Sequence, residues 1–289
     1  MSEPLAVGLV GAGPWAAMVH APVLAAGPET RLVGIWNRTP EKAEELAKKH
    51  GARAFARYEE LLDSCEAVAF CVSPEVQADV AVDAARAGKA VLLEKPLALD
   101  IGGAQRIVDA VGEAGVASLV VLSFRYSQGV REFLDKAASF DAFAGRGCFL
   151  SGAFLGGPFA YGWRLERGGL LDVGPHIIDL ADAALGPTVD VRAHGDRRWT
   201  VVHLQHESGA LSEIAISCYA GVENRTEIEL FGEKGSLHLD ARAVTGPRAF
   251  ALLRKEFAEA ARAGGGHHID AARGLHLQRL LDAAQSQLA

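Results

Sequence analysis

Residues 5–16, LAVGLVGAGPWA, join an apolar run to a glycine-rich turn and to the start of a helix. The turn has the spacing G-x-G-x-x-A, in which Gly11 permits a tight turn and Gly13 lets a pyrophosphate approach the backbone. The N–H groups at the start of the helix would bind that anion. An ordinary strand-to-helix turn is the alternative. We expect a dinucleotide site here, with cofactor contacts from Gly11, Gly13, Pro14, Trp15 and Ala16.

Short apolar runs alternate with helical patterns as far as residue 124. Strands are expected at 5–10, 31–37, 67–73, 90–95 and 116–124, and helices at 14–26, 40–50, 76–88 and 101–115. Strands that are apolar throughout and are separated by helices are typical of a parallel sheet covered on both faces. Residues 1–124 are therefore predicted to form a doubly wound Rossmann domain of the α/β class.

The second half of the chain has longer strands in which apolar and polar residues alternate. They are expected at 146–155, 189–206, 211–220 and 225–240, with hairpin turns at Ser208-Gly209 and near Gly235. Further helices are expected at 169–185, at 250–263 and at about 270–289, where Asp270 would be the N-cap. We predict that residues 125–289 form an α+β domain with an open, mainly antiparallel sheet, for substrate binding and oligomerisation.

The composition argues against several classes of partner. The chain has 289 residues, of which 49% are hydrophobic, and its formal net charge is −7. Without a dense Lys/Arg stripe, neither a nucleic acid nor an anionic membrane is an expected partner. An apolar stretch of about eighteen residues, as a membrane span needs, is missing. The four cysteines are scattered and are expected to be reduced thiols of a cytoplasmic protein.

The residues after the second predicted strand bear on the choice of dinucleotide. Asn37, Arg38 and Thr39 stand where folds that prefer NAD usually place an acid for the ribose 2′-hydroxyl. Asn37 can bond a ribose, while Arg38 and Thr39 can hold a 2′-phosphate, which a carboxylate would repel. We therefore expect NADP to be preferred over NAD. The alternative is that Arg38 is a solvated charge at the start of a helix.

The segment VLLEKPLALD (91–100) ends a buried strand with Glu94, Lys95 and Pro96, at the sheet edge where ligands bind. Together with GAGPWA, CVSP (71–74) and GGLLDVGPHIIDLA (168–181), it resembles the glucose-fructose oxidoreductase/inositol dehydrogenase (Gfo/Idh/MocA) family. The resemblance extends more loosely to HHIDAARGLHLQRLLDA (267–283).

This resemblance implies an NAD(P)-dependent oxidoreductase that moves a hydride between nicotinamide and a secondary alcohol or ketone of a sugar, cyclitol or related polyol. His176 would exchange the hydroxyl proton, and Lys95 would bind the reacting oxygen beside the nicotinamide. Asp172 would orient the imidazole or bind a substrate hydroxyl, and if 169–185 is one helix, Asp172, His176 and Asp179 share a face. The resemblance also implies cofactor contacts from Ser73, Pro74, Glu94 and Lys95.

Other parts of the resemblance are less specific. Four residues match positions that often contact substrate in the family, although they could equally be packing residues: Arg125, Tyr126, Trp163 and Arg164. No metal is expected, since hydride transfer needs none, and His267-His268 is expected in a solvated loop. The sheet of the second domain is a candidate surface for a homodimer or homotetramer.

The sequence departs from the family pattern at several positions. Gln77 stands where a histidine is common, Arg167-Gly168-Gly169 replaces three glycines, and the second domain is short. Two other functions therefore stay open. One is a redox-neutral glycosidase or dehydratase that recycles bound NAD. The other is a dinucleotide-sensing regulator without turnover.

Overall fold

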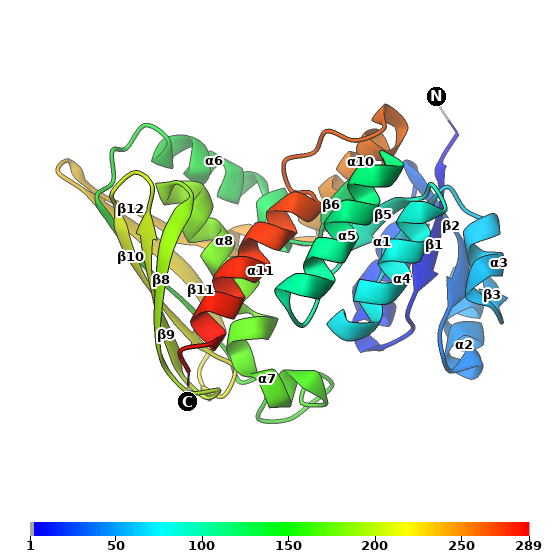
Figure 1. The fold of residues 1–289 in the computed structure, drawn as a ribbon, viewed down its shortest axis with the longest axis horizontal. Coiled ribbons are helices and arrows are strands. Elements are labelled where there is room, and N and C mark those ends of the chain that lie inside the picture. The colour runs from blue at the N-terminus through cyan, green and yellow to red at the C-terminus, as the bar shows by residue number, and fades with distance from the viewer. Residues whose placement is uncertain (1–2, 289) are drawn as a thin grey trace. The chain divides into compact units, whose positions relative to one another are not determined.

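The computed structural model describes residues 3–288, which form two compact units. The first unit contains the chain up to Val121 together with Phe250–Leu275, and the second contains Leu122–Ala249 together with the chain from His276 onward. Figure 1 colours the chain from its N-terminus to its C-terminus. None of the helices within residues 3–288 is long and apolar enough to span a membrane.

The first unit is built on a six-stranded parallel sheet. Its strands are β1 (Leu5–Val10), β2 (Thr30–Trp36), β3 (Arg53–Phe55), β4 (Ala67–Phe70), β5 (Ala90–Leu93) and β6 (Ser118–Val120), in the order β3-β2-β1-β4-β5-β6. This order confirms the doubly wound fold. The sequence analysis missed β3, because its three residues are too few to show a periodic pattern.

Six helical segments accompany this sheet. They are a π-helix, η1 (Ala16–His20), followed by α1 (Ala21–Ala25), α2 (Pro40–His50), α3 (Tyr58–Asp63), α4 (Pro74–Arg86) and α5 (Ile101–Ala114). The helix predicted at 14–26 is present from residue 14 to residue 25, but over Ala16–His20 its backbone closes the wider turn of a π-helix. The segment α3 was not predicted, since it has only six residues.

The second unit has its own six-stranded sheet (Figure 1). Its strands are β7 (Ala144–Leu150), β8 (Thr188–Gly195), β9 (Thr200–His206), β10 (Leu211–Ser217), β11 (Arg225–Gly232) and β12 (Gly235–Asp240), in the order β12-β11-β7-β10-β9-β8. Only the β7–β10 pair is parallel, which confirms the mainly antiparallel sheet. The single strand expected at 189–206 is wrong: the chain turns at Gly195, whose φ of +109° suits glycine, and Asp196 caps the turn.

Helices pack on one face of this second sheet. They include the 3₁₀ segment η2 (Ser123–Tyr126), α6 (Gln128–Ala137), α7 (Trp163–Asp172), α8 (Gly174–Leu185) and α9 (Ala241–Val244), of which α8 contacts β7, β10 and β11. The other face is open, because the strands alternate: on β9, Val202 and Leu204 are buried while His203 and Gln205 are exposed. The helix expected at 169–185 is two helices that meet at Val173.

The chain returns to the first unit near its end, which differs from the division expected at residue 124. Arg254 of α10 (Pro247–Ala263) donates through Nε to Glu29 Oε2 at 2.8 Å and through Nη1 to the Val23 carbonyl at 3.1 Å. The Ile269 carbonyl accepts from Val120 N at 2.8 Å. Asp270 caps α11 (Ala271–Gln285), as predicted, by accepting from Arg273 N. These contacts join distant segments, so local periodicity could not reveal them.

Candidate active site

The glycine turn has the geometry that a bound pyrophosphate needs. Gly11 has φ +115°, and a Cβ there would lie 2.2 Å from the Cys71 carbonyl oxygen, so no larger residue fits. A Cβ on Gly13 would meet no heavy atom within 4 Å. Gly13 is therefore not required by packing, and the space beside it is where a phosphate would approach the backbone. Ala16 is fully buried, as close packing of the helix on the sheet requires.

Asn37 connects this turn to the end of β2. Its Oδ1 accepts from Ala12 N at 3.2 Å, and its Nδ2 donates to the Thr39 carbonyl at 3.0 Å. Arg38 and Thr39 are exposed beside it. Asn37 thus supports the loop by two hydrogen bonds of its own.

Gln77 of α4 holds the end of β5 in place. Glu94 N donates to Gln77 Oε1 at 2.9 Å, and Gln77 Nε2 donates to the carbonyls of Glu94 at 2.8 Å and of Leu97 at 3.0 Å. The Lys95–Pro96 peptide bond is cis. The buried amide at position 77 therefore satisfies both backbone groups of Glu94 and fixes the segment that carries Lys95. Ser73 and Pro74 begin α4, and the Ser73 carbonyl accepts from Gln77 N.

The Glu94 carboxylate is bound by protein donors on both oxygens. Trp15 Nε1 donates to Oε1 at 2.9 Å, His20 Nε2 lies 2.7 Å from the same atom, and Lys95 N donates to Oε2 at 3.2 Å. Trp15 also packs edge-on against Phe250, with 6.3 Å between the ring centroids. The sequence analysis missed His20, although its place on the helix after the glycine turn was a signal that could have been used.

His176 lies in the first turn of α8, among aromatic side chains. Its ring is 5.4 Å from that of Phe124 in an edge-on arrangement and 6.3 Å from that of Phe149 in a stacked one. The residue is half-buried. These two rings flank the imidazole and give it partly apolar surroundings.

Asp172, at the end of α7, pairs with Arg164 at 3.3 Å. The Arg164 guanidinium in turn lies over the rings of Trp163 at 4.7 Å, Phe159 at 5.7 Å and Tyr161 at 5.7 Å. Such cation–π contacts stabilise a charge that is largely removed from water. Arg164 therefore fixes the carboxylate of Asp172 and Trp163 supports the guanidinium, while contact of this pair with a substrate stays a prediction.

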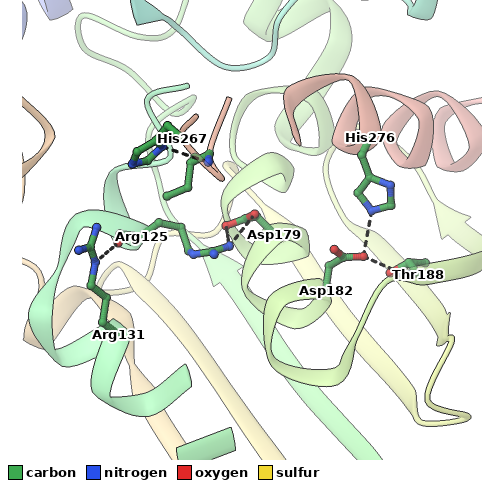
Figure 2. A network of polar contacts seen from close by, with 8 residues as sticks. Arg125, Arg131, Asp179, Asp182, Thr188, His267 and His276 are labelled. Atoms are coloured by element: carbon green, nitrogen blue, oxygen red, sulfur yellow. Dashed lines mark hydrogen bonds and ion pairs between the residues drawn. The ribbon is translucent and has the colours of Figure 1, made fainter. Parts of the chain in front are cut away.

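Arg125, which is expected from the sequence to contact substrate or to serve packing, forms an ion pair with an acid of α8. Its Nη1 donates to both carboxylate oxygens of Asp179 at 3.1 Å. Arg131 Nε donates to the Arg125 carbonyl at 2.9 Å (Figure 2). Tyr126 is only 1% exposed. Arg125 therefore neutralises an acid of α8 and Tyr126 is a core residue of the second unit, while contact of this pair with a substrate stays a prediction.

Two other clusters are structural. Asp182 Oδ1 accepts from Thr188 N at 2.6 Å and lies 3.0 Å from His276 Nε2 (Figure 2). His267 and His268 lie in a loop, as the sequence predicts, and His268 is exposed; His267 is partly buried, with its Nε2 3.1 Å from Glu256 Oε2 and its ring stacked on that of His268. Within residues 3–288, no group of three or more His, Cys, Asp or Glu side chains has an arrangement that could hold a metal ion.

Comparison with known proteins agrees with this architecture. Residues 5–122 match the model of the oxidoreductase family with an NAD-binding Rossmann fold, and residues 145–238 match the GFO/IDH/MocA C-terminal domain. Among solved structures, GenD2 from gentamicin A biosynthesis, in complex with NAD, has a TM-score of 0.86 at 22% identity and covers 99% of this chain and 95% of its own. Levoglucosan dehydrogenase, in complex with NADH, has a TM-score of 0.88 at 20% identity, with 98% and 96% covered.

Several characterised enzymes are similar in sequence. The dTDP-3,4-didehydro-2,6-dideoxy-α-D-glucose 3-reductase of Streptomyces violaceoruber is 30% identical over 84% of this chain and 74% of its own, and that of Streptomyces antibioticus is 30% identical over 94% of each. Myo-inositol 2-dehydrogenase of Thermotoga maritima is 26% identical over 81% and 75%. The chain therefore belongs to the Gfo/Idh/MocA family of NAD(P)-dependent oxidoreductases.

Proposed function

We propose that this protein transfers a hydride between a nicotinamide dinucleotide and a secondary alcohol or ketone of a sugar, cyclitol or related polyol. The observation that carries the proposal is the support given to Lys95, whose segment at the end of β5 makes four hydrogen bonds with Gln77: Glu94 N donates to Oε1, and Nε2 donates to the carbonyls of Glu94, Pro96 and Leu97. The relatives named for activity on a dTDP-keto sugar and on myo-inositol support the same substrate class.

The residues would share the chemistry as follows. The bound dinucleotide supplies or accepts the hydride at its nicotinamide ring. Lys95 Nζ donates a hydrogen bond to the reacting oxygen and stabilises the negative charge that develops there. His176 takes the hydroxyl proton during oxidation and returns it during reduction; its Nδ1 is buried, which leaves Nε2 as the nitrogen that can meet a substrate. Asp172, held by Arg164, accepts a hydrogen bond from a neighbouring substrate hydroxyl or from the imidazole.

The proposed reaction can be tested with a panel of polyols and keto sugars, including a dTDP-linked keto sugar, while the absorbance of the reduced nicotinamide is followed. Lys95→Met and His176→Asn should each lower turnover by about 10²- to 10⁴-fold and leave dinucleotide affinity nearly unchanged. Lys234→Met, in the exposed β11–β12 turn, is the matched control and should retain full activity. Unchanged rates in both active-site variants would remove the mechanism. Dinucleotide retained through dialysis without a net absorbance change would instead indicate a redox-neutral enzyme.

For the cofactor, we propose that NADP is preferred, on the basis of the exposed Arg38 and Thr39 and the absence of an acid between residues 37 and 39. The guanidinium would bind the 2′-phosphate through charge-assisted hydrogen bonds. Arg38→Asp should weaken NADPH binding about tenfold or more and leave NADH binding less affected, as measured by titration of cofactor fluorescence. A wild-type protein that binds NADH more tightly than NADPH would contradict the preference.

The remaining proposals concern assembly and location. The open face of the second sheet, with the exposed Leu211, supports a homodimer or homotetramer formed through that face. The four cysteines are all reduced thiols, which supports a location in the cytoplasm.

A further inference from the structure

Two side chains of the segment that follows the glycine turn meet at one oxygen atom. Trp15 Nε1 and His20 Nε2 lie 2.9 Å and 2.7 Å from Glu94 Oε1, and His20 is only 4% exposed. Both donors belong to the helical segment that begins the dinucleotide site, whereas Glu94 immediately precedes Lys95. The contact therefore joins the cofactor loop directly to the segment that bears the proposed catalytic lysine.

The π-helix makes this meeting possible. Ala21 N donates to the Ala16 carbonyl, which closes a turn of five residues in place of four. In a regular α-helix, residues five apart point about 140° away from one another, so Trp15 and His20 could not reach the same atom. The wider turn brings them to one side. Single π turns are uncommon and occur frequently at functional sites, where they place a particular side chain.

Burial makes these bonds necessary. Glu94 is 8% exposed, and a carboxylate removed from water needs donors on its oxygens. The 2.7 Å contact is favourable when His20 carries its proton on Nε2 and donates it to Oε1, since the carboxylate can only accept. With Trp15 as the second donor, Oε1 is held from two directions, and the plane of the carboxylate is set. Oε2 accepts a longer bond from Lys95 N, at 3.2 Å, and is the oxygen that we expect to bind a ribose hydroxyl.

We infer that His20 is a positioning residue, which sets the orientation of Glu94 and thereby that of the nicotinamide ribose and of Lys95. The inference rests on the proposed function, because it concerns the same dinucleotide. A packing role is the competing explanation. The two roles predict opposite rankings of the His20 variants in NADPH affinity and in kcat/KM. An apolar side chain of similar size would satisfy a packing role, whereas only a side chain with a donor would satisfy a positioning role.

The experiment compares His20→Leu with His20→Gln. His20→Leu leaves Oε1 with one donor, so the affinity for NADPH and the value of kcat/KM should each fall about 10- to 100-fold. His20→Gln restores an N–H near the same place and should recover most of both quantities. Binding is measured by NADPH fluorescence and turnover with the substrate that the panel identifies. His50→Leu, at the end of α2 in the same unit, is the control and should behave as wild type.

A second variant tests whether both donors act on one atom. Trp15→Phe removes the indole N–H and keeps an aromatic ring against Phe250. Because both donors bind Oε1, the losses of NADPH affinity and of kcat/KM in Trp15→Phe and His20→Leu should not add in the double variant. Thermal unfolding of each variant shows whether it is folded.

The outcomes separate this inference from the proposed function. Suppose that wild-type protein binds the dinucleotide and turns over substrate. If folded His20→Leu then has the NADPH affinity and kcat/KM of wild type, or higher values than His20→Gln, His20 is a packing residue and the inference is wrong. Additive losses in the double variant would also contradict it, since the two donors would then act independently. If wild-type protein neither binds nor uses a dinucleotide, it is the proposed function that fails.

Discussion

Gly11 and Gly13 stand two residues apart in one turn, yet the structure gives them different physical reasons to be glycine. At Gly11 the backbone itself excludes a side chain, because φ is +115° and a Cβ would overlap the Cys71 carbonyl. At Gly13 the protein leaves open space around the same position. The first glycine therefore serves folding and the second serves the ligand, a distinction that the motif alone does not make.

This distinction predicts opposite behaviour of two alanine variants. Gly11→Ala should lower the free energy of unfolding by about 2 kcal/mol or more, through strain and overlap, and should lose dinucleotide binding as well. Gly13→Ala should change stability by less than about 0.5 kcal/mol, because its methyl group meets no protein atom. It should still weaken NADPH binding, since the methyl group occupies the phosphate approach. Thermal unfolding and cofactor titration of both proteins check this, and a large loss of stability in Gly13→Ala would contradict it.

At the scale of the elements, helix α8 carries two buried acids, and each is bound by a partner in the second unit. Asp179 is 1% exposed and is paired with Arg125, and Asp182 caps the start of β8 through Thr188 N. A buried charge tolerates the loss of its partner poorly, because its desolvation is then uncompensated. Asp179 thus joins α8 to η2 and Asp182 joins it to the first residue of β8, so both pairs help to fix the helix that carries His176.

Arg125→Met tests the first of these pairs. The change removes the cation and leaves the Asp179 carboxylate buried, so the free energy of unfolding should fall by about 3–5 kcal/mol in urea denaturation. Adding Asp179→Leu to this variant removes the orphaned charge and should recover a large part of that loss. If Arg125→Met is as stable as wild type, the pair does not hold α8 in place.

His206 on β9 predicts how stability depends on pH. Burial lowers the pKa of this imidazole, and the Gly186 carbonyl and Asp182 oppose the shift only in part. Below a pH of about 6.5, an unfolded chain takes up a proton at His206 that the folded protein does not, so stability is lost as pH falls. The slope of unfolding free energy against pH should be smaller in His206→Gln.

At the scale of the whole molecule, the open face of the second sheet predicts the state of assembly. Leu211 on β10 is 59% exposed, and exposed apolar residues on a broad sheet face are typical of an interface. Leu211→Glu should therefore shift the sedimentation coefficient toward that of a monomer. Val222→Glu, in the loop after β10, changes the same kind of exposed residue off the sheet and should leave assembly intact. A wild-type protein that sediments as a monomer would contradict the proposal.

Much of the fold could be predicted from the sequence, since its signals are local. The alternation of strands and helices, the glycine turn and the hairpin at Ser208-Gly209 each depend on residues a few positions apart. Errors fell on segments whose local signal is short or interrupted. They are the three-residue β3, the turn at Gly195 inside an apparently continuous strand, and the break at Val173 between α7 and α8.

The sequence by itself determined the family, the parallel direction of the strands in the first sheet and the candidate residues Lys95, Asp172 and His176. Spacing along the chain encodes these features. Only the tertiary structure decided the partners of those residues. It paired Asp172 with Arg164 and Arg125 with Asp179, directed His20 and Trp15 to Glu94, and returned Phe250–Leu275 to the first unit. Except for Asp172 and Arg164, which are eight residues apart, these contacts join positions more than fifty residues apart, and packing of the whole chain selects them where periodicity does not.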